Sequence, residues 1–79
     1  MERNEILAKL QGVFREELDK ESLVITELSS AQNVDGWDSL SHIQLISAIE
    51  DEFDISFTSK EIMSWKNIGE MIDSIQKYL

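Results

Sequence analysis

The stretch that decides the fold is residues 36–53, which read Gly-Trp-Asp-Ser-Leu-Ser-His-Ile-Gln-Leu-Ile-Ser-Ala-Ile-Glu-Asp-Glu-Phe. Apolar residues recur at steps of three and four, which predicts an amphipathic helix from about Ser39 to Phe53 with Asp38 as its N-cap. Leu40 and Ile43 fall beside the core-facing side of this helix, and at least one of them is expected to be exposed. The predicted core residues of the helix are Leu45, Ile46, Ile49 and Phe53.

Three further helices are predicted around this segment. Apolar spacing predicts one over about residues 2–19. A capping box at Thr58–Glu61 opens a short helix that ends near Ser64, and Asn67 opens a last helix. The apolar face of that last helix consists of Ile68, Met71, Ile72 and Ile75. Four helices with a long first connection predict an all-α four-helix bundle.

Residues 20–37 are predicted to form the long connection between the first two helices. A brief strand at residues 23–26 is an alternative, although no partner strand is offered. Residues 53–57 also alternate like a strand and are predicted to be a connector. The long connection is expected to be pinned to the core by several of its apolar residues, which are Leu23, Val24, Ile25, Leu28 and Val34. Ordered connections of this length are usually functional.

Composition limits the classes of function. A chain of 79 residues predicts a single domain over residues 1–79. Sixteen acids against seven bases give a net charge of −9, which argues against nucleic acid and anionic membranes and favours basic partners. With no cysteine and only one histidine, no metal site is expected. No apolar run approaches the roughly 18 residues of a membrane span, and no signal peptide is recognised. A cytoplasmic location without membrane insertion is therefore expected. The chain is also expected to be a monomer.

Ser39 is the candidate functional residue. It lies in the first turn of the predicted second helix, where the helix dipole favours an anion by about 0.3–1 kcal/mol. The other nine serines lie inside helices, near the ends of the third helix or in connections. By itself, the position favours a serine that only starts a helix, and a lone Asp-Ser-Leu tripeptide is a weak signal.

The wider context of Ser39 resembles a known family. Residues 36–53 are similar to the second helix of acyl carrier proteins, which combine a glycine-containing turn, Asp-Ser-Leu, an apolar-periodic helix and an acidic run closed by phenylalanine. The long first loop, the short third helix and the acidic balance also fit, so the resemblance covers nearly the whole chain. It implies the acyl carrier protein fold and a 4′-phosphopantetheine arm that is taken from coenzyme A and bound covalently to Ser39.

The resemblance also implies a role as a carrier without catalytic residues of its own. Acyl or aminoacyl intermediates would be held as thioesters on the arm and presented to other enzymes. The implied partners are a phosphopantetheinyl transferase, together with acyl-activating or acyl-transfer enzymes and synthases that have basic docking patches. Asp38 and Glu50 are expected to supply the attraction to those patches, because both lie on the same side of the helix wheel as Ser39.

The sequence departs from the fatty-acid carriers at specific positions. Many of those carriers have acids at the positions of Ser41 and Gln44, and a small residue at the position of Trp37. The double glycine that is common in peptidyl carriers is also absent. Within fatty acid or polyketide biosynthesis in the broad sense, the chain therefore resembles free-standing carriers of specialised pathways with small acyl or aminoacyl cargo.

Two alternatives stay open on the sequence. The chain could be an unmodified acidic helical adaptor that binds a basic partner protein. It could also be a small enzyme that uses Ser39 with His42, although no third group orients the histidine. His42 is expected to be a packed histidine, and Trp65 is expected to close the core.

Overall fold

The computed structural model describes residues 1–79 and contains four helices. These are α1 (Arg3–Glu17), α2 (Ser39–Phe53), α3 (Ser59–Ser64) and α4 (Ile68–Tyr78). All four predicted helices are present, and α2 has the predicted bounds and the predicted N-cap. Neither strand-like segment forms a strand. The prediction of an all-α bundle is therefore confirmed.

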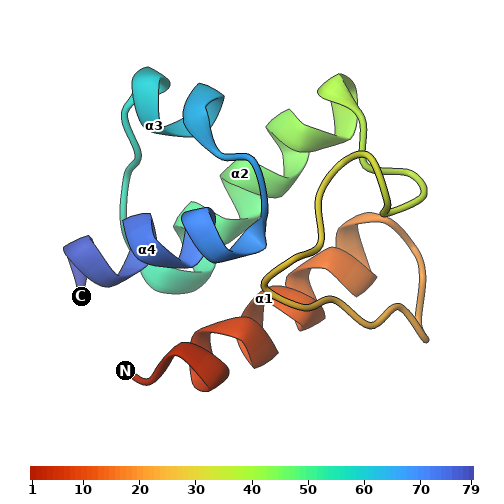
Figure 1. The fold of residues 1–79 in the computed structure, drawn as a ribbon, viewed down its shortest axis with the longest axis horizontal. Coiled ribbons are helices and arrows are strands. Elements are labelled where there is room, and N and C mark those ends of the chain that lie inside the picture. The colour runs from red at the N-terminus through yellow and green to blue at the C-terminus, as the bar shows by residue number, and fades with distance from the viewer.

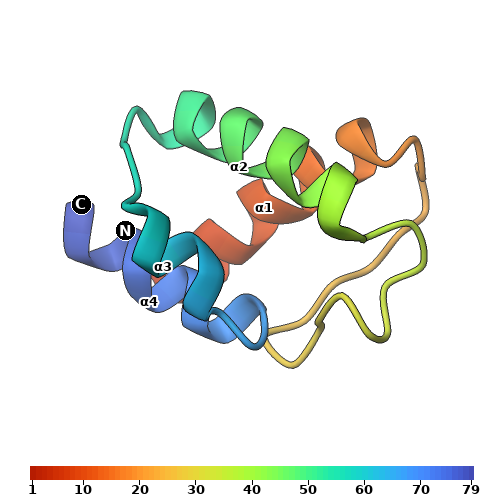
Figure 2. The same cartoon turned by 90° about the horizontal axis from the view of Figure 1, so that it is seen from above.

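The helices are arranged in three levels. α1 lies at one side of the molecule, α2 and α4 lie next to each other above it, and the short α3 lies on the side opposite to α1 (Figure 1). The view from above shows α2 and α4 flanking the line of α1, with α3 between them (Figure 2). Both views place the two chain ends side by side. None of the four helices combines the length and the apolarity that a membrane crossing requires.

The core is built from the apolar faces of α1, α2 and α4. The residues with no exposed surface are Ile6, Leu10, Phe14, Leu45, Ile49, Ile68, Met71, Ile72 and Ile75. Full burial of each such side chain contributes about 1.5–3 kcal/mol. Every residue predicted for the core faces of α2 and α4 is buried. In contrast, α3 contains no buried residue, so hydrogen bonds and partly buried side chains must hold it in place.

The first connection, residues 18–38, is ordered by a few contacts rather than by every apolar residue in it. Ile25 and Val34 are buried and act as the expected apolar anchors, whereas Val24 and Leu28 are exposed and do not. Val24 precedes Ile25 in non-helical backbone, where neighbouring side chains point to opposite sides and only one of them can face the core. The connection also accepts hydrogen bonds from the first backbone N–H groups of α4, at its Glu27 and Ser29 carbonyls.

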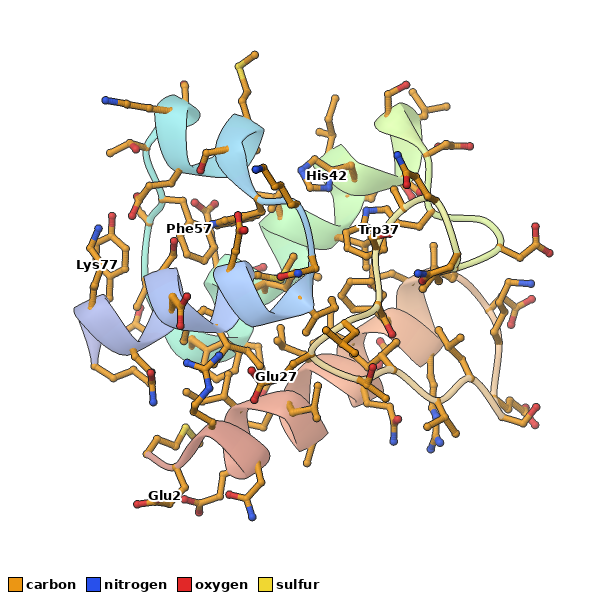
Figure 3. The ribbon with its side chains drawn as sticks, viewed as in Figure 1. Glu2, Glu27, Trp37, His42, Phe57 and Lys77 are labelled. Carbon is orange, nitrogen blue, oxygen red and sulfur yellow. The ribbon has the colours of Figure 1, made fainter.

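Arg3 ties the first connection to both ends of the chain. Its guanidinium group donates to both carboxylate oxygens of Glu27, to Asp73, to Gln76 and to the Gly69 carbonyl. The hydrogen bonds from Arg3 hold the pKa of Glu27 below its ordinary value. Glu27 therefore points from the connection toward α1 and α4, and the segment that leads to Ser39 is held in one position (Figure 3).

Candidate functional site

Asp38 fixes the start of α2 and thereby the position of Ser39. One Asp38 carboxylate oxygen accepts hydrogen bonds from the backbone N–H groups of Leu40 and Ser41, at 3.0 and 2.9 Å. In return, the Asp38 N–H donates to the Ser41 hydroxyl at 2.9 Å, which closes a capping box. The Ser41 N–H bond is the main reason why the pKa of Asp38 lies below its ordinary value. The Ser41 hydroxyl also donates to the Gly36 carbonyl at 2.7 Å, so Ser41 is a structural residue of the turn.

Ser39 has a hydroxyl group that the fold leaves free. It is the first residue of α2, it is exposed, and its side chain takes part in no hydrogen bond of the structure. The serines whose hydroxyls do make hydrogen bonds are Ser29, Ser30, Ser41, Ser64 and Ser74. Among the five serines with free hydroxyls, Ser39 is the one that lines the groove described next.

A groove of about 670 Å³ opens beside Ser39, between the start of α2, the end of α3 and the first connection. Trp37, His42 and Trp65 contribute aromatic surface to it, and Lys66 contributes its only basic side chain. The groove is thus large enough for a slender, mostly apolar group that begins at Ser39.

His42 joins the groove's three walls. The Trp37 indole N–H donates to His42 Nδ1 at 3.1 Å, and His42 Nε2 lies 3.3 Å from the Ile62 carbonyl oxygen. Because an indole nitrogen can only donate, Nδ1 must accept, and the proton on Nε2 then faces Ile62. Figure 3 shows the Trp37 and His42 side chains next to each other at the start of α2. Both ring nitrogens of His42 therefore make contacts within the fold, which confirms the prediction of a packed histidine. His42 is then not available as the base that an enzyme using Ser39 and His42 would need.

Trp65 separates the groove from the interior, as predicted. Its indole N–H donates to the hydroxyl of the buried Ser74 at 2.8 Å. Its ring packs edge-on against Phe57, with ring centroids 4.8 Å apart, and Phe57 lies between α3 and α4 (Figure 3). Trp65 also lies edge-on to His42 at 6.3 Å. These contacts make a continuous aromatic wall at the base of the groove.

Asp38 and Glu50, the acids predicted to attract partners, both accept hydrogen bonds within the fold. The Asp38 carboxylate caps α2, as described above. Glu50 shares the side of α2 with Ser39 but lies 11 residues further along, which is about 17 Å at 1.5 Å per residue. Its carboxylate accepts the Phe57 N–H at 2.8 Å and thereby holds the connector between α2 and α3. Glu50 therefore lies on the predicted side of α2 but far from Ser39, because a helical wheel shows direction and not distance along the axis.

Several groove residues were not predicted from the sequence. Ile62, Met63 and Lys66 come from the short third helix and the turn after it, and residues 30–32 come from the first connection. A six-residue helix is too short for its periodicity to show which side faces a groove. Met63 was the one signal in the sequence that could have indicated the groove. It is a large apolar residue among charged and polar neighbours, it had no predicted contact, and it is exposed in the structure.

Comparison with known proteins gives a consistent result. A family model described as "Phosphopantetheine attachment site" matches residues 4–75. The chain is 31% identical over 74 residues to an acyl carrier protein of Buchnera aphidicola, covering 94% of this chain and 86% of that protein. It is 32% identical over 76 residues to an acyl carrier protein of Prochlorococcus marinus, covering 96% and 95% of the two chains.

A solved structure shares both the fold and part of the sequence. The solution structure of a holo acyl carrier protein from Geobacter metallireducens superimposes with a TM-score of 0.84 at 39% identity. The match covers 91% of this chain and 83% of that one.

Proposed function

This chain belongs to the acyl carrier protein family, whose members carry a covalent 4′-phosphopantetheine, and we propose that Ser39 is the residue that bears the arm. The observation that carries this proposal is the free, exposed Ser39 hydroxyl at the start of α2, on the edge of the groove. The surroundings fit the group, because a phosphodiester at the N-terminus of α2 meets the positive end of the helix dipole. The groove adjoins the serine and is lined mainly by aromatic and small polar side chains.

The chain is not an enzyme in this proposal. When bound, the arm supplies a terminal thiol that holds an acyl group as a thioester. No group near Ser39 is free to remove its proton, since His42 uses both ring nitrogens and the Asp38 carboxylate caps α2. The transferase must therefore supply the base when the arm is transferred from coenzyme A. The protein's part is to present the serine, and later the cargo, to its partners.

The proposed partners are a phosphopantetheinyl transferase, acyl-activating or acyl-transfer enzymes, and synthases with basic docking patches. Exposed acids on α1 and α2 support this proposal, since the chain has a net charge of −9. We expect residues 1–79 to act as a single carrier domain and as a monomer. A cytoplasmic location also stays a prediction.

The pathway is proposed to be a specialised one with small acyl or aminoacyl cargo. Trp37 supports it, because the residue is buried and packs edge-on against Phe14, with ring centroids 4.9 Å apart. Trp65 and Phe57 occupy the space between α3 and α4 in the same way. Aromatic rings packed at these two places leave little room there for a long acyl chain.

The proposal is tested by intact mass spectrometry after incubation with coenzyme A and a broad-specificity phosphopantetheinyl transferase. We expect one arm to be added to the wild type and to the Ser59→Ala variant, and none to be added to Ser39→Ala. Ser59 is the matched control because it is also an exposed serine at the start of a helix. A wild-type chain that gains no mass would instead support the unmodified acidic adaptor. An arm on Ser39→Ala would overturn the site assignment.

A further inference from the structure

The hydrogen bond between Trp37 and His42 can exist only while the imidazole is neutral. The Trp37 indole N–H donates to His42 Nδ1 at 3.1 Å, and Figure 3 shows the two side chains next to each other. An indole nitrogen can only donate, whereas a charged imidazole has an N–H on each ring nitrogen and accepts at neither. A proton that His42 takes up from water must go to Nδ1, and it therefore removes the acceptor of the Trp37 N–H.

Trp37, rather than His42, is the partner that has to move when this bond is lost. His42 Nε2 lies 3.3 Å from the Ile62 carbonyl oxygen, and a charged imidazole donates more strongly to such an oxygen than a neutral one does. The Trp37 indole is buried edge-on against Phe14, where an N–H without an acceptor is unfavourable. The indole also borders the groove of about 670 Å³ beside Ser39. Charging His42 therefore favours displacement of the indole toward the groove, where its N–H meets water.

His42 is the group that responds to pH in this part of the molecule. It is the only histidine in the chain, and it is half-buried. It belongs to none of the ion pairs of the structure. Histidine is the side chain whose charge ordinarily changes between pH 5 and 7, whereas carboxylates and side-chain amines ordinarily keep theirs.

The charged groups around His42 have other contacts or the same charge as the protonated ring. Asp38 and Lys66 line the groove with His42, and the Asp38 carboxylate caps α2. On α3, the Glu61 carboxylate accepts hydrogen bonds from the Thr58 N–H and the Tyr78 hydroxyl. On the first connection, the Asp35 carboxylate lies 3.5 Å from Lys20 Nζ. No carboxylate therefore pairs with a charged His42 in place of the lost bond.

Trp37 directly precedes Asp38 and Ser39 in the chain. Resting on the proposed function, we propose that His42 is a positioning residue for Ser39 and that its protonation state controls arm transfer. The neutral ring holds Trp37, and with it the entry of the chain into α2. The charged ring releases Trp37, and Ser39 then becomes a poorer acceptor of the arm. The carrier itself thus makes its modification sensitive to acid below about pH 6.

Release of Trp37 is tested by NMR of the two indole N–H groups in the unmodified wild type, with Trp37→Phe to assign them. The Trp65 N–H is the internal control, because it donates at 2.8 Å to the Ser74 hydroxyl, which does not titrate in this range. From pH 7.5 to 5.5 we expect the Trp37 resonance to move in a single titration. Its exchange with deuterium should rise about two- to tenfold relative to Trp65, the range for one hydrogen bond. A Trp37 signal that follows Trp65 throughout would overturn the proposal.

The effect on Ser39 is tested by competition between two carriers for one transferase and limiting coenzyme A, with both products measured by mass. The pH dependence of the transferase acts on both carriers alike and cancels in the ratio of products. His42→Asn keeps an acceptor oxygen near the place of Nδ1 and does not titrate. Between pH 8 and pH 5.5, the ratio of modified wild type to modified His42→Asn should fall about two- to tenfold.

His42→Leu tests the opposite case, because it offers Trp37 no acceptor at any pH. The wild type should be modified faster than His42→Leu at pH 8 and should lose this advantage at pH 5.5. The ratio of wild type to Ser59→Ala is the control and should be the same at both pH values. Product ratios to both His42 variants that do not change with pH would overturn the positioning role. Failure of the proposed function is a separate result, namely a wild type that gains no arm at any pH, whereas the indole measurement needs no arm.

Discussion

The indole N–H of Trp37 donates to His42 Nδ1 at 3.1 Å, and this bond connects the end of the first connection to the second turn of α2. The two rings are nearly parallel, with an interplanar angle of 21° and ring centroids 6.1 Å apart. Because His42 Nε2 faces the Ile62 carbonyl, the same imidazole also holds the end of α3. The residue that precedes Asp38 and Ser39 is therefore anchored to both helices that border the groove.

The Trp37–His42 bond should be measurable as a coupling between the two residues. Trp37→Phe leaves the half-buried Nδ1 of His42 without its donor, which costs about 1–3 kcal/mol in addition to the lost ring volume. In a double-mutant cycle with His42→Leu, we expect a coupling energy of at least about 0.5 kcal/mol in urea unfolding. Additive losses would mean that the bond contributes nothing to stability.

Ser39→Ala should leave the fold nearly intact. The N-cap of α2 is the Asp38 carboxylate, and the Ser39 hydroxyl makes no hydrogen bond. Asp38→Ala removes two hydrogen bonds to the start of α2 and should cost about 0.5–2 kcal/mol, whereas Ser39→Ala should change the free energy of unfolding by less than about 0.5 kcal/mol. Urea unfolding compares the two variants, and equal losses would show that Ser39 has a structural role.

The two sides of α2 should differ strongly in their sensitivity to truncation. Ile49 has no exposed surface and Phe53 is buried, whereas Ile43 is mostly exposed. Ile49→Ala or Phe53→Ala should cost about 2–5 kcal/mol, and Ile43→Ala should stay within about 0.5 kcal/mol. Urea melts of the three variants measure the difference. Similar losses at all three positions would mean that Ile43 is covered in solution.

Glu61 should make the stability depend on pH in acid. Hydrogen bonds from the Thr58 N–H and the Tyr78 hydroxyl lower the pKa of Glu61 to about 2, from an ordinary value of 4.5. A lowered pKa means that the contribution of the carboxylate is fully present above pH 4.5 and is lost as the pH falls toward about 2. The free energy of unfolding should therefore fall in this range, and it should fall less steeply in Glu61→Gln.

The remaining acid sensitivity of Glu61→Gln has an identifiable source. Arg3 lowers the pKa of Glu27, and backbone N–H groups lower the pKa of Asp38, so both carboxylates act in the same direction. Glu21→Gln is the control, because Glu21 is exposed and makes no hydrogen bond or ion pair. Parallel curves for wild type, Glu61→Gln and Glu21→Gln would contradict a stabilising role of the Glu61 contacts.

Salt should raise stability and slow arm transfer over the same range. Self-repulsion at a net charge of −9 is screened by salt, which favours the compact state. The attraction between the acids of the chain and a basic partner is screened as well, since the Debye length is only about 10 Å at 0.1 M salt. Melting temperature and modification rate are measured in one salt series. A melting temperature that falls with salt would show that ion pairs such as Arg3–Glu27 outweigh the repulsion.

The sequence by itself determined the helices and the candidate serine. The spacing of Leu45, Ile49 and Phe53 defines the buried side of α2, and Asp38 defines its start. These features are local, because a helix and its N-cap depend on residues within four positions of one another. The exposure of Leu40 and Ile43 followed from the same periodicity, since a helix packed on one side leaves the other side in solvent.

Only the tertiary structure decided what surrounds Ser39. The pairing of His42 with Trp37 and Ile62, the groove lined by Lys66, and the exposure of Val24 and Leu28 depend on how distant segments meet. The same holds for Glu50, which shares a helix side with Ser39 but uses its carboxylate to hold Phe57. Periodicity gives the direction of a side chain about its own helix axis. Periodicity does not show which loop or helix a side chain will contact, or how far along the axis the contact lies. These are set by packing between elements that are far apart in the chain.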